Sequence, residues 1–258
     1  MRILFVGDIV GQPGRQMLVR HLKELVAEHG ADVVLANAEN AAAGFGITPS
    51  VGEELFGVGV DLLTSGNHVW DKKEAEAYLA QEPRVLRPAN YPDEVPGRGV
   101  HILRKADQLV GVLNLQGRAF LPPIDCPFRA ADREIAELRR VTATIVVDFH
   151  AEATAEKQAF GWYLDGRVSA VLGTHTHIQT ADERLLPHRT AYITDVGMTG
   201  PRDSVIGIRP QDALHRFLTQ MPQKFTVAPG SLQLNAVLLD VGEDGLARGI
   251  RRIQLQEE

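Results

Sequence analysis

The first half of this chain alternates short runs of aliphatic and β-branched residues with longer amphipathic stretches, and this alternation constrains its fold more than any other feature. Strands are predicted at 3–7, 32–37 and 60–65, and helices at 15–29, 48–55 and 71–81. Strands that alternate with helices are joined by right-handed crossovers into a mostly parallel sheet. The N-terminal half therefore predicts an α/β architecture.

The second half adds a hairpin and further strands. The hairpin is predicted at 99–105 and 108–116, with its turn at Ala106 and Asp107. Further helices are predicted at 130–140 and 152–163, and further strands at 144–150, 169–175, 190–196, 233–241 and 246–255. We expect residues 1–258 to form a single domain, in which parallel and antiparallel strands build two packed sheets with helices outside.

Net charge and cysteine content limit which partners the protein can bind and in which cellular compartment it is expected. A net charge of −6 with a pI near 5.9 argues against stable binding of long nucleic acids, which requires a basic face. The single cysteine, Cys126, cannot form a disulfide within the chain, which favours a reducing compartment. The sequence shows neither the apolar region of a signal peptide nor a membrane-length apolar stretch, so we expect a cytoplasmic protein without a membrane partner.

Side chains that can bind metal ions recur directly after five of the predicted strands. They are Asp8, Glu39, Asn40, Asn67, His68, His150, His175 and His177. Ligands of α/β sheets bind outside the carboxyl ends of the strands, so these residues are expected to converge on one crevice. A helix cap, a turn hydrogen bond or a solvated surface position would explain any one of them alone. Their recurrence after five separate strands favours a common site.

The chemistry of these side chains suits a centre with two metal ions. Carboxylate, amide oxygen and imidazole together favour Mn or Fe, and the absence of thiolates disfavours a structural zinc. Glu39 could bridge two ions, which would lower the pKa of a bridging water and supply hydroxide near neutral pH. If the segment around His175 and His177 is extended, both imidazoles project to the same side. The sequence therefore predicts metal-assisted hydrolysis of a phosphoester.

Three motifs resemble those of the calcineurin-like metallophosphoesterases: GNH at 66–68, the separate His150, and GTHTH at 173–177. The start of the chain departs from that pattern, because Ile9 and Val10 follow Asp8 where the family usually has a histidine. Glu39 and Asn40 stand where its second acidic block belongs. Longer motifs resemble a bacterial subfamily described as 2′,3′-cyclic-nucleotide phosphodiesterases: GDIVGQPGR (7–15), NAENAAAGFGIT (37–48), SGNHVWD (65–71), RPANYP (87–92), DFHAEAT (148–154) and GMTGPRDSVIG (197–207).

This resemblance implies a metallophosphoesterase-like four-layer α/β/β/α sandwich, with two mixed sheets flanked by helices. It also implies two metal sites that share Glu39. The first site would be completed by Asp8, Asn40 and His177, and the second by Asn67, His150 and His175. His68 is not a ligand in the family pattern and is expected to act as general acid toward the leaving alkoxide. The alternative is that His68 only binds phosphate or packs behind the ligands.

The leading functional prediction is a phosphodiesterase that hydrolyses small phosphodiesters such as 2′,3′-cyclic AMP, through a metal-bridging hydroxide with His68 as the acid. Two alternatives stay open, namely a phosphomonoesterase of broad specificity and a non-catalytic, metal-containing regulatory protein. A dinucleotide-dependent oxidoreductase is disfavoured because Gly7, Gly11 and Gly14 do not have the required spacing. The glycine-rich segment 197–207 is expected to line the substrate pocket. Whether identical chains assemble into an oligomer is left open.

Overall fold

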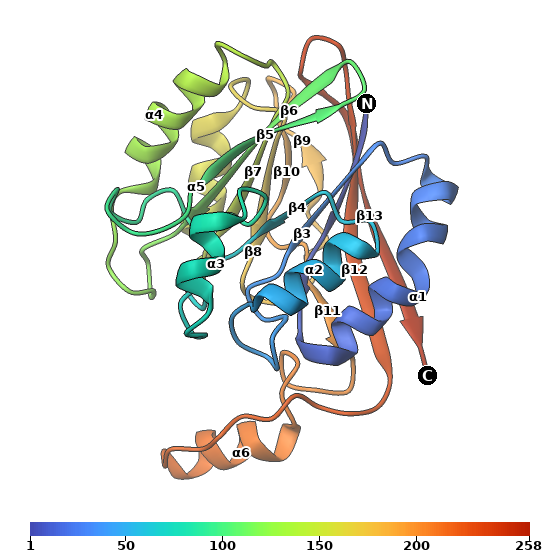
Figure 1. The fold of residues 1–258 in the computed structure, drawn as a ribbon, viewed down its shortest axis with the longest axis vertical. Coiled ribbons are helices and arrows are strands. Elements are labelled where there is room, and N and C mark those ends of the chain that lie inside the picture. Colours follow the sequence, from blue (N-terminus) through green and yellow to red (C-terminus); the bar gives the residue numbers. More distant parts are fainter.

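The computed structural model describes residues 1–258, and its strands form two mixed sheets (Figure 1). The first sheet contains β1 (Arg2–Val6), β2 (Asp8–Ile9), β3 (Val33–Asn37), β4 (Leu62–Thr64), β11 (Met198–Pro201), β12 (Leu232–Val241) and β13 (Ala247–Glu257). Its order is β2-β11-β12-β1-β3-β4, and β13 pairs with β12. Strands β1, β3 and β4 run parallel, whereas β12 is antiparallel to β1 and to β13.

The second sheet has six strands and also mixes the two directions. It contains β5 (Val100–Lys105), β6 (Gln108–Gln116), β7 (Ile145–His150), β8 (Ala170–Thr174), β9 (Arg184–Leu185) and β10 (Ala191–Ile193). Their order is β5-β6-β7-β8-β10-β9. The four central strands run parallel, and the edge strands β5 and β9 are antiparallel to their neighbours. The predicted hairpin of β5 and β6 is confirmed.

The two sheets pack face to face through an apolar core that both of them supply. Ile3 and Phe5 of β1 enter this core together with Val112 of β6 and Leu172 of β8. The intervening residue Leu4 belongs instead to the core on the outer face of the first sheet. Successive side chains of a strand point to opposite faces, so β1 is buried on both sides. This explains why its sequence is a continuous apolar run.

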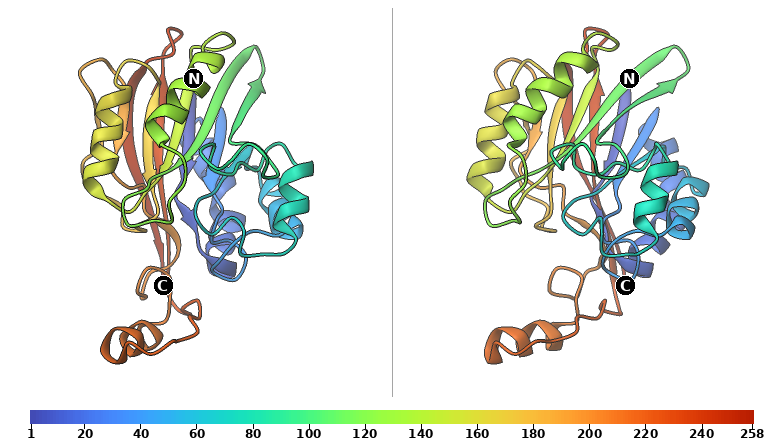
Figure 2. Two further views of the ribbon diagram at one scale, coloured as in Figure 1. Left: turned by 90° about the vertical axis from the view of Figure 1, so that its left-hand side faces the viewer. Right: turned by 60° about the vertical axis from the view of Figure 1, so that its left-hand side comes forward.

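Helices cover the outer face of each sheet and complete four layers (Figure 2). The first sheet packs against α1 (Gly11–His29), α2 (Pro49–Gly57) and α3 (Ala75–Gln81). The second sheet packs against α4 (Pro127–Leu138) and α5 (Thr154–Leu164). The predicted α/β/β/α sandwich is therefore confirmed. None of the six helices combines the length and the apolar character needed to cross a membrane.

Several elements differ from the sequence-based expectations. Helix α1 begins four residues earlier than expected, and Pro13 is accommodated in its first turn, where a backbone N–H has no helical partner. The helix predicted at 71–81 is shortened to α3. Helix α6 (Pro210–Thr219) was not predicted, nor were β2, β9 and β11. Strands of two to four residues are too short to display a hydrophobic period, and α6 projects beyond the body of the sandwich (Figure 2).

A buried ion pair joins α5 to the segment that follows β10. Nζ of Lys157 donates to Oδ2 of Asp195 at 2.7 Å and to the backbone oxygen of Thr174 at 2.7 Å. Both charged side chains are almost completely excluded from solvent. Such a pair contributes little net stability when complete, but removal of one partner leaves an uncompensated buried charge.

We therefore predict that Lys157→Ala lowers the free energy of unfolding by about 3–5 kcal/mol. Arg140→Ala is the matched control, because Arg140 forms an exposed ion pair with Glu137 and should leave stability nearly unchanged. Urea denaturation of the wild-type protein and the two variants measures the change in the free energy of unfolding that each substitution causes. Equal stability of Lys157→Ala and the wild-type protein would show that the pair is dispensable.

Candidate metal centre

The side chains expected at the metal centre come from both sheets and meet at one end of the sandwich. Asp8 lies at the start of β2, immediately after β1, and Glu39 follows β3 in the first sheet. His150 ends β7, and His175 follows β8 in the second sheet. Because β1 and β3 are parallel, as are β7 and β8, each sheet presents its residues at its carboxyl edge. The packing of the two sheets brings these edges together.

Three of the predicted ligands surround Nε2 of a fourth, His150. This nitrogen lies 3.0 Å from Oε1 of Glu39, 3.2 Å from Oδ1 of Asn67 and 3.0 Å from Nδ1 of His175. Ligand atoms of Glu39, His150 and His175 all lie within 4.8 Å of one another. The four residues that the resemblance assigns to one metal ion are thus brought together.

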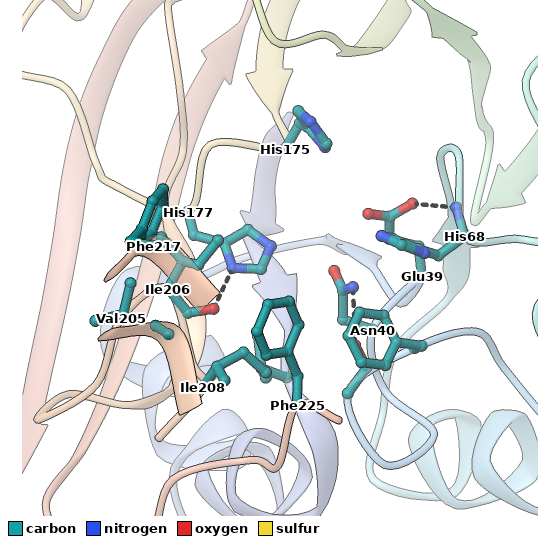
Figure 3. Close-up of a pocket in the computed structure, with 14 residues that line it drawn as sticks. Glu39, Asn40, His68, His175, His177, Val205, Ile206, Ile208, Phe217 and Phe225 are labelled. Carbon is teal, nitrogen blue, oxygen red and sulfur yellow. Dashed lines mark hydrogen bonds between the residues drawn. The ribbon is translucent and has the colours of Figure 1, made fainter. Parts of the chain in front are cut away.

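The remaining three predicted ligands lie beside this group. Oδ1 of Asp8 is 3.9 Å from Nε2 of His177 and 3.9 Å from Nδ1 of His150. Nδ1 of His177 donates to the backbone oxygen of Ile206 at 2.9 Å, which leaves Nε2 available as a ligand. The amide nitrogen of Asn40 donates to the oxygen of Gly44 at 3.0 Å, so its Oδ1 is free to bind an ion. Figure 3 shows Asn40 and His177 on opposite sides of one cavity.

Three buried oxygens at this place lack a well-formed hydrogen bond, namely Oδ1 of Asp8, Oδ1 of Asn40 and Oε1 of Glu39, which faces a ring nitrogen of His150 at 3.0 Å. They are half of the six buried side-chain polar atoms in the molecule that lack a well-formed hydrogen bond. A buried polar atom without a partner is unfavourable unless something else satisfies it. Metal ions would bind all three oxygens, so the donor set fits the ions that the sequence predicts.

The charges of this cluster are strongly coupled. Burial opposes ionisation of Glu39, but the interactions with His150 and His68 together outweigh that effect and lower the pKa of Glu39 to about 2. Burial likewise opposes protonation of His150, and the Glu39 carboxylate nevertheless raises the pKa of His150 to about 9. Burial raises the pKa of Asp8 well above its usual value. A metal ion would compete with the proton on His150, so metal affinity should fall as pH falls.

A buried hydrogen-bond chain orients the His150 ring. Oγ1 of Thr174 donates to Oδ1 of Asp148 at 2.7 Å and lies 2.9 Å from Nδ1 of His150. A hydroxyl has one hydrogen to donate, so Nδ1 of His150 must donate to Thr174. This fixes which nitrogen carries a hydrogen and directs Nε2 toward the other ligands, as partners behind metal-binding histidines commonly do.

The segment that carries His175 and His177 is not extended, so the condition under which both imidazoles would project to the same side is not met. Strand β8 ends at Thr174, and the two histidines have φ angles of 99° and 67°. Such angles are unfavourable for residues other than glycine and persist only where the surroundings enforce them. Asp195 enforces them here, because its Oδ2 accepts hydrogen bonds from the backbone nitrogen and the hydroxyl of Thr176 at 3.0 and 2.7 Å.

His68 lies at the wall of the cavity and has partners of its own. Its Nδ1 is 2.8 Å from Oδ2 of Asp71, and an ionised carboxylate can only accept, so Nδ1 is the donor. Its ring packs edge-on against Phe45, with ring centroids 5.0 Å apart. Its backbone nitrogen donates to Oε2 of Glu39 at 3.1 Å. Nε2 is therefore the nitrogen that can deliver a proton.

The glycine of the GNH motif has a steric explanation. A Cβ atom at Gly66 would lie 2.1 Å from Cδ2 of His150. Only glycine allows the backbone to approach the imidazole this closely. Gly66 thereby places Asn67 against His150.

The cavity beside these side chains has a volume of about 490 Å³. Its lining residues are Val10, Glu39, Asn40, Gly44, Phe45, His68, His175, His177, Val205, Ile206, Ile208, Ala213, Phe217 and Phe225. Val205 and Ile206 belong to the segment 197–207, so the end of this segment lines the cavity beside the predicted ligands. The volume lies within the range of small-molecule sites.

Sequence reasoning missed the residues that support the ligands. Asp71 and Thr174 contact the predicted site residues His68 and His150, whereas Asp148 and Asp195 hold Thr174 and Thr176. None of these four follows a strand as a separate motif. Asp71 is three residues after His68. This spacing is visible in the sequence, but it does not by itself indicate that the two side chains are in contact. Glu152, whose Oε2 is 3.1 Å from Nε2 of His175, was likewise not assigned a role.

Comparison with known proteins bears on the same site. The model of the YmdB-like protein family matches residues 4–253. A 2′,3′-cyclic-nucleotide 2′-phosphodiesterase of Bacillus subtilis (strain 168) is 49% identical over 94% of this chain and 92% of that protein. The crystal structure of a novel phosphatase from Mycoplasma pneumoniae matches with a TM-score of 0.94 at 34% identity, covering 100% of this chain and 94% of that one.

A more distant structure shows the same fold. A putative 5′-nucleotidase from Staphylococcus aureus matches with a TM-score of 0.59 and 16% identity, over 98% of this chain and 54% of that one. The four-layer metallophosphoesterase-like sandwich is therefore shared well beyond the range of clear sequence similarity.

We predict that His150→Ala greatly reduces the metal content of the purified protein, because His150 Nε2 lies at the centre of one ligand group. His188→Ala is the control, since this ring is mostly exposed and its carboxylate partner, Asp165, is not a predicted ligand. Elemental analysis by mass spectrometry measures the metal content of both variants. Full metal content in His150→Ala would remove this residue from the ligand set.

Metal ions should also stabilise the fold, because they would satisfy the three oxygens of Asp8, Glu39 and Asn40 that lack a well-formed hydrogen bond. At a free ion concentration about 100-fold above Kd, the expected stabilisation is about 2.7 kcal/mol. Calorimetry of chelator-treated protein, with and without added Mn²⁺, measures the shift in Tm. An unchanged Tm would contradict metal binding at this place.

Proposed function

This chain belongs to the YmdB-like protein family, and on that premise we propose that it hydrolyses small phosphodiesters, in particular 2′,3′-cyclic nucleotides such as 2′,3′-cyclic AMP. The observation that carries the proposal is the position of the His68–Asp71 pair beside the ligand cluster, on the wall of one cavity. A metal site that served structure alone would need no oriented proton donor. The similarity to the Bacillus subtilis 2′,3′-cyclic-nucleotide 2′-phosphodiesterase supports the choice of substrate.

We assign the ligands as two groups that share Glu39. Asp8, Asn40 and His177 would hold one ion together with Glu39, and the other ion would be held by Glu39, Asn67, His150 and His175. Imidazole and oxygen donors without thiolates favour Fe or Mn. When bound, such ions supply an activated water and positive charge that stabilises the phosphoryl oxygens.

His68 contributes the proton that the leaving group requires. A water molecule loses one proton to the solvent and its oxygen forms a bond to phosphorus, while the bond between phosphorus and one of the two ribose oxygens breaks. Nε2 of His68 gives its proton to that oxygen, so that a hydroxyl leaves in place of an alkoxide. Asp71 holds Nδ1 and stabilises the protonated ring before the transfer. The product is a nucleoside monophosphate.

A phosphomonoesterase is the second candidate, because the similar Mycoplasma pneumoniae structure is described as a phosphatase. The same ligands and the same acid serve both reactions, so substrate shape decides between them. We further propose a cytoplasmic location, on the basis of the single cysteine. A small phosphoester suits the acidic chain better than long nucleic acid.

Metal analysis combined with hydrolysis of 2′,3′-cyclic AMP tests the proposal. We expect about two Mn or Fe ions per chain and release of a nucleoside monophosphate that a chelator abolishes. Comparison with a phosphomonoester substrate separates the two candidates. Metal-loaded protein without activity on any phosphoester would contradict an enzymatic role.

His68→Ala should keep both metal ions but lower the turnover of unactivated esters by about 10²–10⁴-fold, because the alkoxide would leave without a proton. A p-nitrophenyl ester needs no proton on its leaving group and should lose much less activity. Asp71→Asn should give a smaller loss than His68→Ala. An equal loss for both kinds of ester in His68→Ala would indicate a role in binding phosphate.

A further inference from the structure

The cavity beside the metal centre has two chemically different ends. Its polar side chains are Glu39, Asn40, His68, His175 and His177, all of which belong to the proposed reaction centre. The rest of its wall is apolar and is formed by Val10, Phe45, Val205, Ile206, Ile208, Ala213, Phe217 and Phe225. Figure 3 shows Phe225 and Ile208 grouped below Asn40 and His177, with His175 on the far side.

Most of this apolar wall comes from one projecting segment, residues 203–228, which contains α6 and which we call the arm. Figure 2 shows the arm extending from the end of the sandwich. The returning part of the arm packs against the body at Val227, because a Cβ atom at Gly44 would lie only 3.0 Å from Cγ2 of this residue. The backbone nitrogen of Ala228 also donates to the oxygen of Gly207 at 2.9 Å. Phe225 therefore occupies a defined position over the cavity.

The apolar end offers almost no directional hydrogen bonds to a ligand. The backbone nitrogens of Val205 and Ile208 each donate to the other residue's oxygen, at 2.9 and 3.0 Å. The oxygen of Ile206 accepts from His177. The side chains there are aliphatic or phenyl groups. Recognition at this end therefore depends on shape and on contact with ring faces.

We propose that the apolar end of the cavity binds the base of the substrate by stacking and does not read which base is present. This inference rests on the proposed function, because it takes the phosphate to lie at the metal centre. Phe217 and Phe225 are 73% and 37% exposed, and a planar base would cover these rings. Stacking on aromatic side chains tolerates every base, since each has a π-face.

The same geometry excludes strong discrimination among bases. Selectivity of many orders of magnitude requires buried donors or acceptors that stay unpaired when the wrong substrate binds. No side chain at the apolar end of the cavity carries a hydrogen-bond donor or acceptor. The substrate class is therefore any small phosphodiester with a flat aromatic group beside the phosphate, including all four 2′,3′-cyclic nucleotides.

The test compares the four 2′,3′-cyclic nucleotides with 1-O-methylribose 2′,3′-cyclic phosphate, which keeps the sugar and the phosphate but has no base. For the wild-type, metal-loaded enzyme we expect kcat/KM values of the four nucleotides within about tenfold of one another. The base-free compound should be poorer by about 5- to 150-fold, mainly through KM.

Phe217→Ala should reduce kcat/KM for the nucleotides and leave the base-free compound unchanged. Leu218→Ala is the matched control, because Leu218 is the next residue of α6, is 82% exposed and does not line the cavity. It should behave like the wild type with every substrate. Phe225→Leu is a second variant, which keeps an apolar side chain but removes the ring. Metal content of each variant verifies that the centre is intact.

The outcomes separate this inference from the proposed function. Equal kcat/KM for the base-free compound and the nucleotides would overturn the stacking site while leaving the phosphodiesterase intact. A preference of more than about tenfold for one base would overturn base-independent binding. If Phe217→Ala and Phe225→Leu had the same kcat/KM for the nucleotides as the Leu218→Ala control, the stacking site would also be overturned. Absence of hydrolysis with all five compounds would instead overturn the proposed function and this inference with it.

Discussion

The face-to-face packing of the two sheets is the interaction on which the site depends. Glu39 belongs to the first sheet and His150 to the second, yet their ligand atoms lie 3.0 Å apart. They meet because an apolar core of 18 buried residues holds the sheets together with their carboxyl edges on the same side. Burial of that much apolar surface is the dominant favourable contribution to folding. Neither sheet alone could assemble the cluster.

The fold holds the cluster in an arrangement that is locally unfavourable. Buried oxygens of Asp8, Glu39 and Asn40 lack well-formed hydrogen bonds, and His175 and His177 have positive φ angles. Neighbouring buried groups enforce this arrangement. Lys157 and Asp195 hold Thr174 and Thr176, on either side of His175, and Asp148 acts on His150 through Thr174. Local strain at a site that binds ions is the common price of a pre-organised set of ligands.

The arm contributes the part of the cavity that the sandwich does not provide. The ligand cluster can position a phosphoester group, but it has few contacts for the organic part of a substrate. Phe217 and Phe225 reach the cavity from a segment that lies beyond the layered body. The reaction centre and the contacts to the rest of the substrate thus come from different parts of the chain. This separation allows the arm to change substrate preference without disturbing the centre.

The amino-acid pattern alone predicts the layered α/β architecture and the residues that meet at the candidate metal centre. The apolar runs of β1, β3 and β7 are long enough to identify strands, and a polar side chain after each strand is visible without coordinates. The hydrogen bonds that hold the predicted ligands, such as the Asp148–Thr174–His150 chain, are visible only in the folded structure, because those partners are distant in sequence or have no distinctive spacing. The same is true of the non-extended course of the segment at His175 and of the position of α6. A backbone turn held by a buried Asp195, and a helix that lies outside the main core, leave no hydrophobic period by which the sequence could reveal them.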